Sequence, residues 1–250
     1  MPRVNTDAAV VLRPAAATPP ITLICLPYAG GSHDMFRQWA KDLPDRIELV
    51  SLQLPGRGRR ILDPPYEDWD FLVADASRSL ALYRRGPHAF YGHSFGARLA
   101  YELIQRSGDA NPPMRLFVSG SRGPSVPQQR PFMHPLPEPQ FRAALRQLGG
   151  TPEEIFDDEP LISLLSASVR ADIRLSELWD DRHAGRPITV PVTAMYGRDD
   201  SIDDKVAMAG WADHTCAGFE LLEMPGGHFF LDTHRDELLT VLTARLGLSR

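Results

Sequence analysis

Cysteine is nearly absent from this 250-residue sequence, which contains only Cys25 and Cys216. Two cysteines without motif spacing predict neither a disulfide framework nor a metal site, and they fit a reducing cytoplasm. No stretch approaches the roughly 20 apolar residues that a membrane span needs. The longest apolar run near the N-terminus, residues 8–12, is too short for the core of a signal peptide. We therefore expect a soluble, cytoplasmic protein with no membrane partner.

An excess of basic residues is also lacking. The sequence has 27 Lys and Arg residues against 32 Asp and Glu residues, a formal net charge of −5. Nucleic-acid-binding proteins carry a basic surface, so this balance argues against a nucleic-acid partner. There is no internal repeat and no low-complexity segment. The length suits one α/β domain with a sizeable core, and we expect a monomer.

The stretch that organises the chain is Gly-His-Ser-Phe-Gly at residues 92–96, which fits the pattern Gly-x-Ser-x-Gly. An apolar run ends at Tyr91 just before it, and a helical pattern starts at Phe95. Strand, tight turn and helix is the context in which this pattern forms a nucleophile elbow, with the serine hydroxyl exposed at the apex. The glycines have no Cβ, so the strand and the helix can approach closely. Ser94 is therefore the candidate nucleophile.

Short apolar runs alternate with helical patterns along most of the chain, which predicts βαβ units and a mostly parallel sheet. The expected strands are residues 21–26, 48–54, 88–91, 115–119, 188–196 and 219–224. The expected core helices are residues 33–43, 69–83, 95–106 and 233–246. The predicted fold class is α/β, with a central sheet flanked by helices.

The alternation stops between residues 124 and 186. Prolines are frequent there, and helical segments follow without a convincing strand, at residues 139–148, 151–156 and 160–179. The last segment has a broad apolar face made by Leu161, Leu164, Leu165, Val169, Ala171, Ile173, Leu175 and Leu178. Such a face on an inserted block indicates a lid over a pocket, and ordinary core packing is the alternative. We expect a flexible tail and edge strand at 1–20, a core at 21–123 and 187–250, and a helical lid at 124–186.

Three chemical groups follow three predicted strands in the order Ser94, Asp200, His228. This is the order of the catalytic triad in α/β-hydrolases, so we expect that fold. His228 is the candidate base that takes the serine proton and then protonates the leaving group. Asp200 would hold the imidazole in the required tautomer. Asp199 is the alternative acid, but the spacing Gly-x-x-Asp after the strand favours Asp200.

Other histidines lack this context. His93 is next to the nucleophile, but an adjacent side chain at a sharp turn usually points elsewhere, so we interpret it as a packing residue. His214 and His234 lie in polar, helix-like surroundings. We expect both to be solvated.

Two glycine-containing loops lie near the predicted site. The turn at residues 27–32 follows the first buried strand, and it lacks the Gly-Lys-Ser/Thr of a phosphate loop. In lipases and esterases the corresponding loop supplies an oxyanion-hole N–H, so Ala29 and Phe95 are the candidate donors. The second loop carries Arg57, Arg59 and Arg60. Those arginines form either a solvated charged loop or a docking edge for an acidic partner.

Five motifs together carry a resemblance to a known family. They are Leu-Pro-Tyr-Ala-Gly-Gly-Ser at 26–32, Leu-Pro-Gly-Arg at 54–57, Gly-His-Ser-Phe-Gly at 92–96, Tyr-Gly-Arg-Asp-Asp at 196–200 and Gly-Gly-His-Phe-Phe at 226–230. As an ordered set they resemble the type II, or editing, thioesterases that accompany polyketide and nonribosomal peptide synthases. The likeness extends over nearly the whole chain from about residue 21, and it suggests the stand-alone thioesterase of a rifamycin-type pathway. The region of residues 124–186 matches least well.

The resemblance implies hydrolysis of short or stalled acyl groups from the phosphopantetheine arm of acyl or peptidyl carrier proteins, which would be the partners. It implies an acyl-serine intermediate and neither a metal nor an organic cofactor. Two related alternatives stay open: a medium-chain fatty acyl-carrier thioesterase, and a general serine esterase or lipase acting on free esters. A non-catalytic binding module on the same scaffold would carry a broken triad, and the triad positions here are intact.

Overall fold

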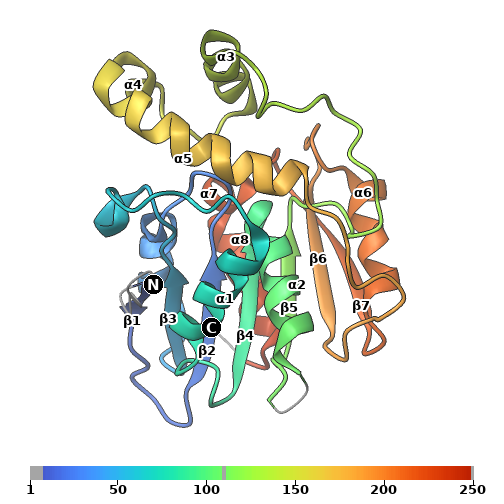
Figure 1. The fold of residues 1–250 in the computed structure, drawn as a ribbon. Helices are drawn as coiled ribbons and strands as arrows, with labels where there is room; N and C mark the ends of the chain where they lie inside the picture. The colour runs from blue at the N-terminus through green and yellow to red at the C-terminus, as the bar shows by residue number, and fades with distance from the viewer. Residues whose placement is uncertain (1–7, 109–110, 249–250) are drawn as a thin grey trace.

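Seven strands form one sheet in the order β1-β3-β2-β4-β5-β6-β7 (Figure 1). The strands are β1 (Ala9–Arg13), β2 (Ile21–Leu26), β3 (Ile47–Leu52), β4 (His88–His93), β5 (Leu116–Ser119), β6 (Val192–Gly197) and β7 (Phe219–Met224). β1 pairs antiparallel with β3, and all other neighbouring strands are parallel. The computed structural model describes residues 8–108 and 111–248, so the first part of the predicted tail, residues 1–7, lies outside the described residues. The predicted α/β class with a mostly parallel sheet is confirmed.

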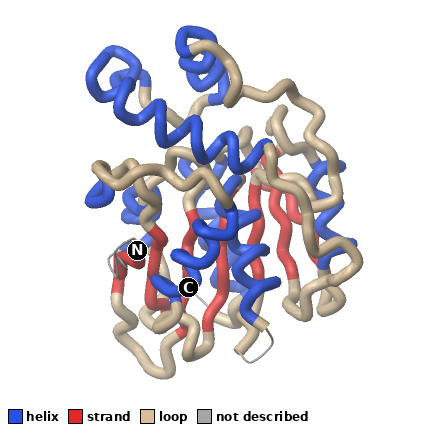
Figure 2. Tube along the Cα trace, in the orientation of Figure 1, coloured by secondary structure: helices blue, strands red, loops and turns tan. Residues whose placement is uncertain are grey.

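Helices cover both faces of the sheet (Figure 2). The α-helices are α1 (Trp69–Leu80), α2 (Phe95–Ser107), α3 (Glu138–Leu148), α4 (Glu153–Asp157), α5 (Glu159–Glu177), α6 (Lys205–Ala209), α7 (Phe230–Thr233) and α8 (Arg235–Arg245). Short 3-10 helices are η2 (His33–Lys41), η3 (Gly58–Arg60) and η4 (Gly210–His214). No helix among the residues with described structure is long and apolar enough to cross a membrane.

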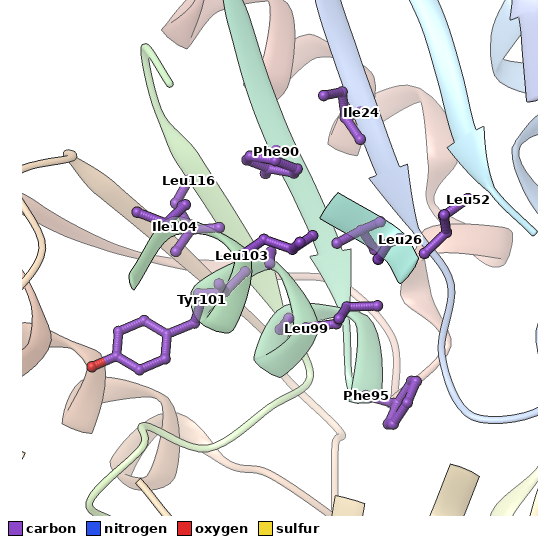
Figure 3. Packing of buried hydrophobic residues seen from close by; sticks show 14 of the residues in the cluster. Ile24, Leu26, Leu52, Phe90, Phe95, Leu99, Tyr101, Leu103, Ile104 and Leu116 are labelled. Atoms are coloured by element: carbon purple, nitrogen blue, oxygen red, sulfur yellow. The ribbon is translucent and has the colours of Figure 1, made fainter. Parts of the chain in front are cut away.

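The core has two layers, one on each face of the sheet. Every residue of β2, β4, β5 and β6 is buried, as expected for strands covered on both faces. On one face, Phe90 and Leu116 of the strands pack with Leu99 and Leu103 of α2 (Figure 3). On the other face, η2 and α8 pack against side chains of alternate strand positions. This rigid support fixes the loops at the strand ends.

Several predicted boundaries differ from the structure for local reasons. The segment after β2 is a 3-10 helix and not an α-helix. β6 begins at Val192 rather than at Ile188, because Pro191 lacks an N–H, and Ile188 makes only an isolated bridge to Thr215. The closing helix is divided into α7 and α8 at His234, which has φ −128° and ψ 44°.

Helices α3, α4 and α5 lie between β5 and β6 in sequence, and in space they cross the end of the sheet where β4 leads into α2 (Figure 1). The buried face of α5 differs from the predicted apolar face. Leu164 and Leu178 are exposed, and Leu161 and Leu165 are only half-buried. The buried residues of α5 are Ile162, Ser166, Ser168, Asp172, Ile173 and Leu175. Polar side chains thus make part of the contact between α5 and the core.

Candidate active site

Ser94 lies at the sharp turn between β4 and α2. Its φ of 53° and ψ of −114° make it the one non-glycine residue with positive φ in the described part of the chain. A Cβ on Gly92 would lie 2.3 Å from the carbonyl oxygen of Gly96, and a Cβ on Gly96 would lie 2.1 Å from that of Leu26. Both positions therefore require glycine. This strained, tightly packed turn has the form of a nucleophile elbow.

His228 and Asp200 are in direct contact. His228 follows β7 in a glycine turn, and its Nδ1 lies 2.8 Å from Oδ2 of Asp200, which follows β6. Oδ1 of Asp200 accepts hydrogen bonds from the N–H groups of Ile202 (2.7 Å) and Asp203 (3.2 Å). An ionised carboxylate can only accept, so Nδ1 of His228 carries the proton and Nε2 is the basic nitrogen. The pair is therefore arranged as an oriented general base.

Asp199 has a different environment from its neighbour. Its side chain is exposed, and its backbone N–H donates to Gly226 O at 2.9 Å. Among the described residues, Asp200 alone forms a carboxylate hydrogen bond to His228. Asp200 is therefore the acid that the structure brings to this histidine.

Ser94 and His228 both lie beside the end of β5. The N–H of Ser94 donates to Ser119 O at 2.8 Å, and a Cβ on the next residue, Gly120, would lie 2.9 Å from Cε1 of His228. The ring of His228 is also 4.9 Å from the ring of His93, measured between centroids. No hydrogen bond joins the Ser94 hydroxyl to His228 within the described ranges. Such contacts often tighten only when substrate is bound.

The two candidate oxyanion donors come from adjacent loops. Gly96 packs against the carbonyl groups of Leu26 and Pro27, so the start of α2 lies against the start of the loop that carries Ala29. Phe95 is the first residue of α2, where N–H groups have no partner within the helix. The Ala29 N–H has no hydrogen-bond acceptor within residues 8–108 and 111–248. Neither N–H group has a hydrogen-bond acceptor among the described residues, so both remain candidates for an oxyanion hole.

A cavity of about 450 Å³ borders His228, the candidate base. Its core side includes His228, Phe229 and Ile202, and Arg130 and Asp199 also line it. The opposite wall is mostly apolar and is built by Phe132, Met133, Leu136, Ala144, Gln147 and Leu148. Ser94, Ala29 and Phe95 do not line this cavity. The volume suits a small acyl group, and the apolar wall suits an acyl group without charge.

His93 is fully buried beside the base, in agreement with the predicted packing role. Its Nδ1 and the hydroxyl of Tyr91 each lie 2.8 Å from the Ser119 hydroxyl. Burial, and then the neighbouring His228, hold the pKa of His93 well below its ordinary value. His93 is therefore a neutral packing residue in the wall behind His228.

Three expectations about polar residues were wrong. Arg57 and Arg60 are buried, so they do not form a docking edge with the exposed Arg59. His214 is also buried, with its Nδ1 3.3 Å from the Tyr101 hydroxyl. His234 is half-buried rather than solvated, and its Nδ1 lies 2.9 Å from the Thr233 hydroxyl. Arg57 and His214 are buried against partners far away in the sequence, Asp172 and Tyr101, which no local pattern predicts.

One residue near the site escaped sequence reasoning altogether. Asp172 of α5 is buried and bonds to the N–H of Gly30, the residue after Ala29, at 2.9 Å. The available signal was an acid between the apolar Val169 and Ile173 on the helix face predicted to be buried. No group of three or more possible metal ligands (His, Cys, Asp or Glu) occurs among the residues that the structure describes.

Comparison with known proteins gives consistent matches along the chain. A family model described as a thioesterase domain matches residues 21–246. The gramicidin S biosynthesis protein GrsT of Aneurinibacillus migulanus is 33% identical over 231 residues, which cover 91% of this chain and 90% of that protein. The thioesterase PikA5 of Streptomyces venezuelae is 33% identical over 253 residues, which cover 98% and 89%. The solved structure of the type II thioesterase BorB from the borrelidin biosynthetic cluster superposes with a TM-score of 0.86 at 35% identity, over 95% of this chain and 97% of that chain.

Proposed function

The chain belongs to the thioesterase family, and on that premise we propose that it is an editing enzyme of polyketide or nonribosomal peptide synthesis. It removes short or aberrant acyl groups from the phosphopantetheine arm of acyl or peptidyl carrier proteins. The relatives support this proposal, because GrsT is named as a gramicidin S biosynthesis protein and BorB as a type II thioesterase from the borrelidin biosynthetic cluster. The pathway that it serves, including one of rifamycin type, stays a prediction, as do the monomeric state and the cytoplasmic location.

The proposed reaction has two halves. Ser94 Oγ attacks the thioester carbonyl while Nε2 of His228 takes its proton, and the N–H groups of Ala29 and Phe95 stabilise the oxyanion. The C–S bond then breaks, and the proton on His228 goes to the departing thiolate. In the second half, His228 takes a proton from water, which attacks the acyl-serine ester, and the same proton returns to Ser94 Oγ. Side chains, main-chain donors and water suffice for every step, so we propose no cofactor.

One observation carries the proposal. Asp200 and His228 form a 2.8 Å contact at the ends of β6 and β7, beside β5, whose last residue bonds to the backbone of the strained Ser94. An oriented imidazole near an elbow serine has little purpose in a binding module. The same geometry suits acyl transfer.

We further propose that residues 124–186 act as the lid, in agreement with the predicted division of the chain. The helices α3 and α5 lie over the sheet end that carries Ser94, and the apolar cavity wall comes from α3 and the loop before it. This wall favours acyl groups without charge. A free carboxylate, as in malonyl, would lose hydration against this wall, and Arg130 is the only described lining residue with a permanent positive charge to offset that cost.

The direct test uses carrier domains loaded with acetyl, propionyl, malonyl and longer acyl groups, followed by mass spectrometry. We expect acetyl and propionyl to be released faster than malonyl. Ser94→Ala should lower the rate by at least about 10³-fold with the fold intact. Full hydrolysis by Ser94→Ala would refute the proposed mechanism, and faster malonyl release would refute the apolar pocket.

Leaving groups and chain lengths separate the alternatives. Turnover of acyl-carrier, acyl-CoA and p-nitrophenyl ester substrates with the same acyl group distinguishes a carrier-directed thioesterase from a general esterase. Preferential release of medium chains would indicate the fatty acyl-carrier alternative. The proposal requires the highest kcat/KM with short-chain acyl-carrier substrates.

A further inference from the structure

Asp172 lies in the middle of α5, and its carboxylate reaches two loops of the core. Its Oδ2 accepts a hydrogen bond from Gly30 N at 2.9 Å and from Arg57 Nη1 at 2.6 Å. The side chains of Arg57 and Asp172 are only 4% and 6% exposed. Arg57 also donates from Nη1 to Gly31 O at 3.3 Å and from Nε to Pro55 O at 3.0 Å. One buried ion pair therefore joins α5 to the loop of residues 27–32 and to the loop of residues 55–60.

The backbone around this ion pair is packed too closely for side chains. A Cβ on Gly30 would lie 2.8 Å from Cγ2 of Val169, and a Cβ on Gly56 would lie 1.7 Å from Oγ of Ser168. The Ser168 hydroxyl donates to Gly56 O at 3.2 Å. This half of α5 is therefore fitted against both loops and has no freedom to lift without breaking these contacts.

Burial of two charges is costly, and well-packed apolar residues would hold α5 at least as well. Arg57 Nη2 is also buried without a hydrogen-bond partner among the described residues. Stability alone thus gives a poor account of this pair. What an ion pair supplies, and apolar packing does not, is direction: each bond fixes the orientation of a particular N–H or carbonyl group.

The bonds fix the one peptide group that matters for the proposed oxyanion hole. The Tyr28 carbonyl and the Ala29 N–H belong to a single planar peptide group and point in opposite directions. The Tyr28 carbonyl accepts from Gly31 N at 2.8 Å, and the adjoining Gly30 N–H is held by Asp172. With both ends of this short turn fixed, the Ala29 N–H has one direction available.

We propose that Asp172 is a positioning residue, which orients the Ala29 N–H toward the oxyanion by holding Gly30 N, and that Arg57 keeps its carboxylate in place. This inference rests on the proposed serine mechanism. It makes the C-terminal half of α5 a fixed part of the active site. Movement of the lid is then left to α3, α4 and the loop before them.

Two double variants test the proposal. Arg57→Met with Asp172→Asn removes both charges but keeps an oxygen that can accept from Gly30 N. Arg57→Met with Asp172→Leu has a side chain with the same branching and number of heavy atoms at position 172, but without that oxygen. The readouts are kcat and KM with an acetyl thioester, and the inhibition constant of an alkyl boronic acid, which bonds to the serine oxygen and places its own oxygen in the oxyanion position.

We expect the Asn variant to keep more activity than the Leu variant, because its amide oxygen still accepts from Gly30 N although Arg57 no longer orients it. The Leu variant should lose about 10- to 100-fold in kcat and in boronic acid affinity, with KM little changed, because a misdirected donor acts mainly on the transition state. Glu220→Gln, which disturbs the ion pair with Arg245 between β7 and α8 and contacts neither loop nor α5, calibrates effects of stability alone. Equal kinetics in the two double variants would overturn the proposal. Failure of the proposed function is a separate outcome. The wild type would then not hydrolyse acyl carriers. Activity of Ser94→Ala would instead refute the serine mechanism.

Discussion

Neighbouring carboxylates can have very different roles, and Asp199 and Asp200 are such a pair. Asp200 accepts from two backbone N–H groups and contacts His228, whereas Asp199 is exposed. We expect Asp200→Asn to lower kcat by about 10⁴-fold, because an amide in place of the carboxylate favours the wrong imidazole tautomer. Asp199→Asn should change kcat little. Steady-state assays of both variants with one thioester provide the measurement.

Equal losses in the two aspartate variants would contradict this assignment. A melting curve for each variant serves as the control, because a partly unfolded protein would lose activity for another reason. The pair is well matched, since both substitutions remove one negative charge within the same turn.

The candidate catalytic residues could be identified from the sequence because each lies in a turn directly after a predicted strand. Ser94, Asp200 and His228 each follow a strand in a turn, and the short motifs around them predict that placement. The partners of Arg57 could not be predicted in this way. Its contact with Asp172 joins residues 115 positions apart, and no local pattern specifies which distant carboxylate a buried arginine meets.

The three helices that cross the sheet end differ in how firmly they are held. The five-residue α4 has no buried residue, and α3 buries only Phe141 and Leu145. The longer α5 buries six residues and is tied to two loops. These differences predict a movable part and a fixed part within residues 124–186.

Hydrogen exchange followed by mass spectrometry measures this difference directly. We expect amides of α3 and α4 to exchange faster than those of residues 166–175 in α5, because opening a segment with few buried contacts costs little free energy. Matching exchange rates throughout residues 138–177 would instead indicate that the three helices open together. A covalent acyl analogue on Ser94 should slow exchange in α3 if that helix closes over the acyl group.

At the level of elements, the limits of α3, α4 and α5 were predicted to within two residues, but the buried face of α5 was not. β2 and β7 have the expected limits, because a short segment rich in apolar residues and bounded by Pro or Gly has a clear beginning and end. The buried face of α5 was misjudged, since the face that contacts the core includes Ser166, Ser168 and Asp172. Helical periodicity identifies apolar faces, and it fails where polar side chains are buried against backbone groups.

The molecule contains a group of buried histidines that affect how its stability depends on pH. Burial lowers the pKa of His33, His88, His93 and His214 below the ordinary value of 6.5. Near pH 6.5 the unfolded chain therefore takes up protons that the folded protein does not. The stability that these neutral histidines contribute is fully present above pH 6.5. It is lost as the pH falls from 6.5 toward their lowered pKa values, by up to about 1.4 kcal/mol per pH unit for each histidine.

Chemical denaturation at pH 7.5, 6.5 and 5.5 tests this expectation, with His93→Gln as the comparison. The wild type should lose more stability between pH 6.5 and 5.5 than the variant, whose position 93 cannot take up a proton in either state. Burial raises the pKa of Asp203 and Asp232, which acts in the opposite direction at lower pH but equally in both proteins. Parallel stability profiles would show that His93 is not held neutral by burial.

For the whole chain, the family resemblance found in five motifs is confirmed by the match over residues 21–246. Ordered motifs report shared ancestry, so they predicted the fold beyond what periodicity supplies. They could not predict where α3 to α5 pack, because the motifs all lie in the core, outside residues 124–186.

The strand order β4-β5-β6-β7 has a consequence for synthesis of the protein in the cell. Ribosomes add residues from the N-terminus, and the serine emerges 134 positions before the histidine, the difference between residues 94 and 228. A nascent chain that ends at β5 has a nucleophile without its base. If Ser94 and His228 act as proposed, hydrolytic activity arises only after β6 and β7 dock, so a chain truncated after β5 is expected to be inactive.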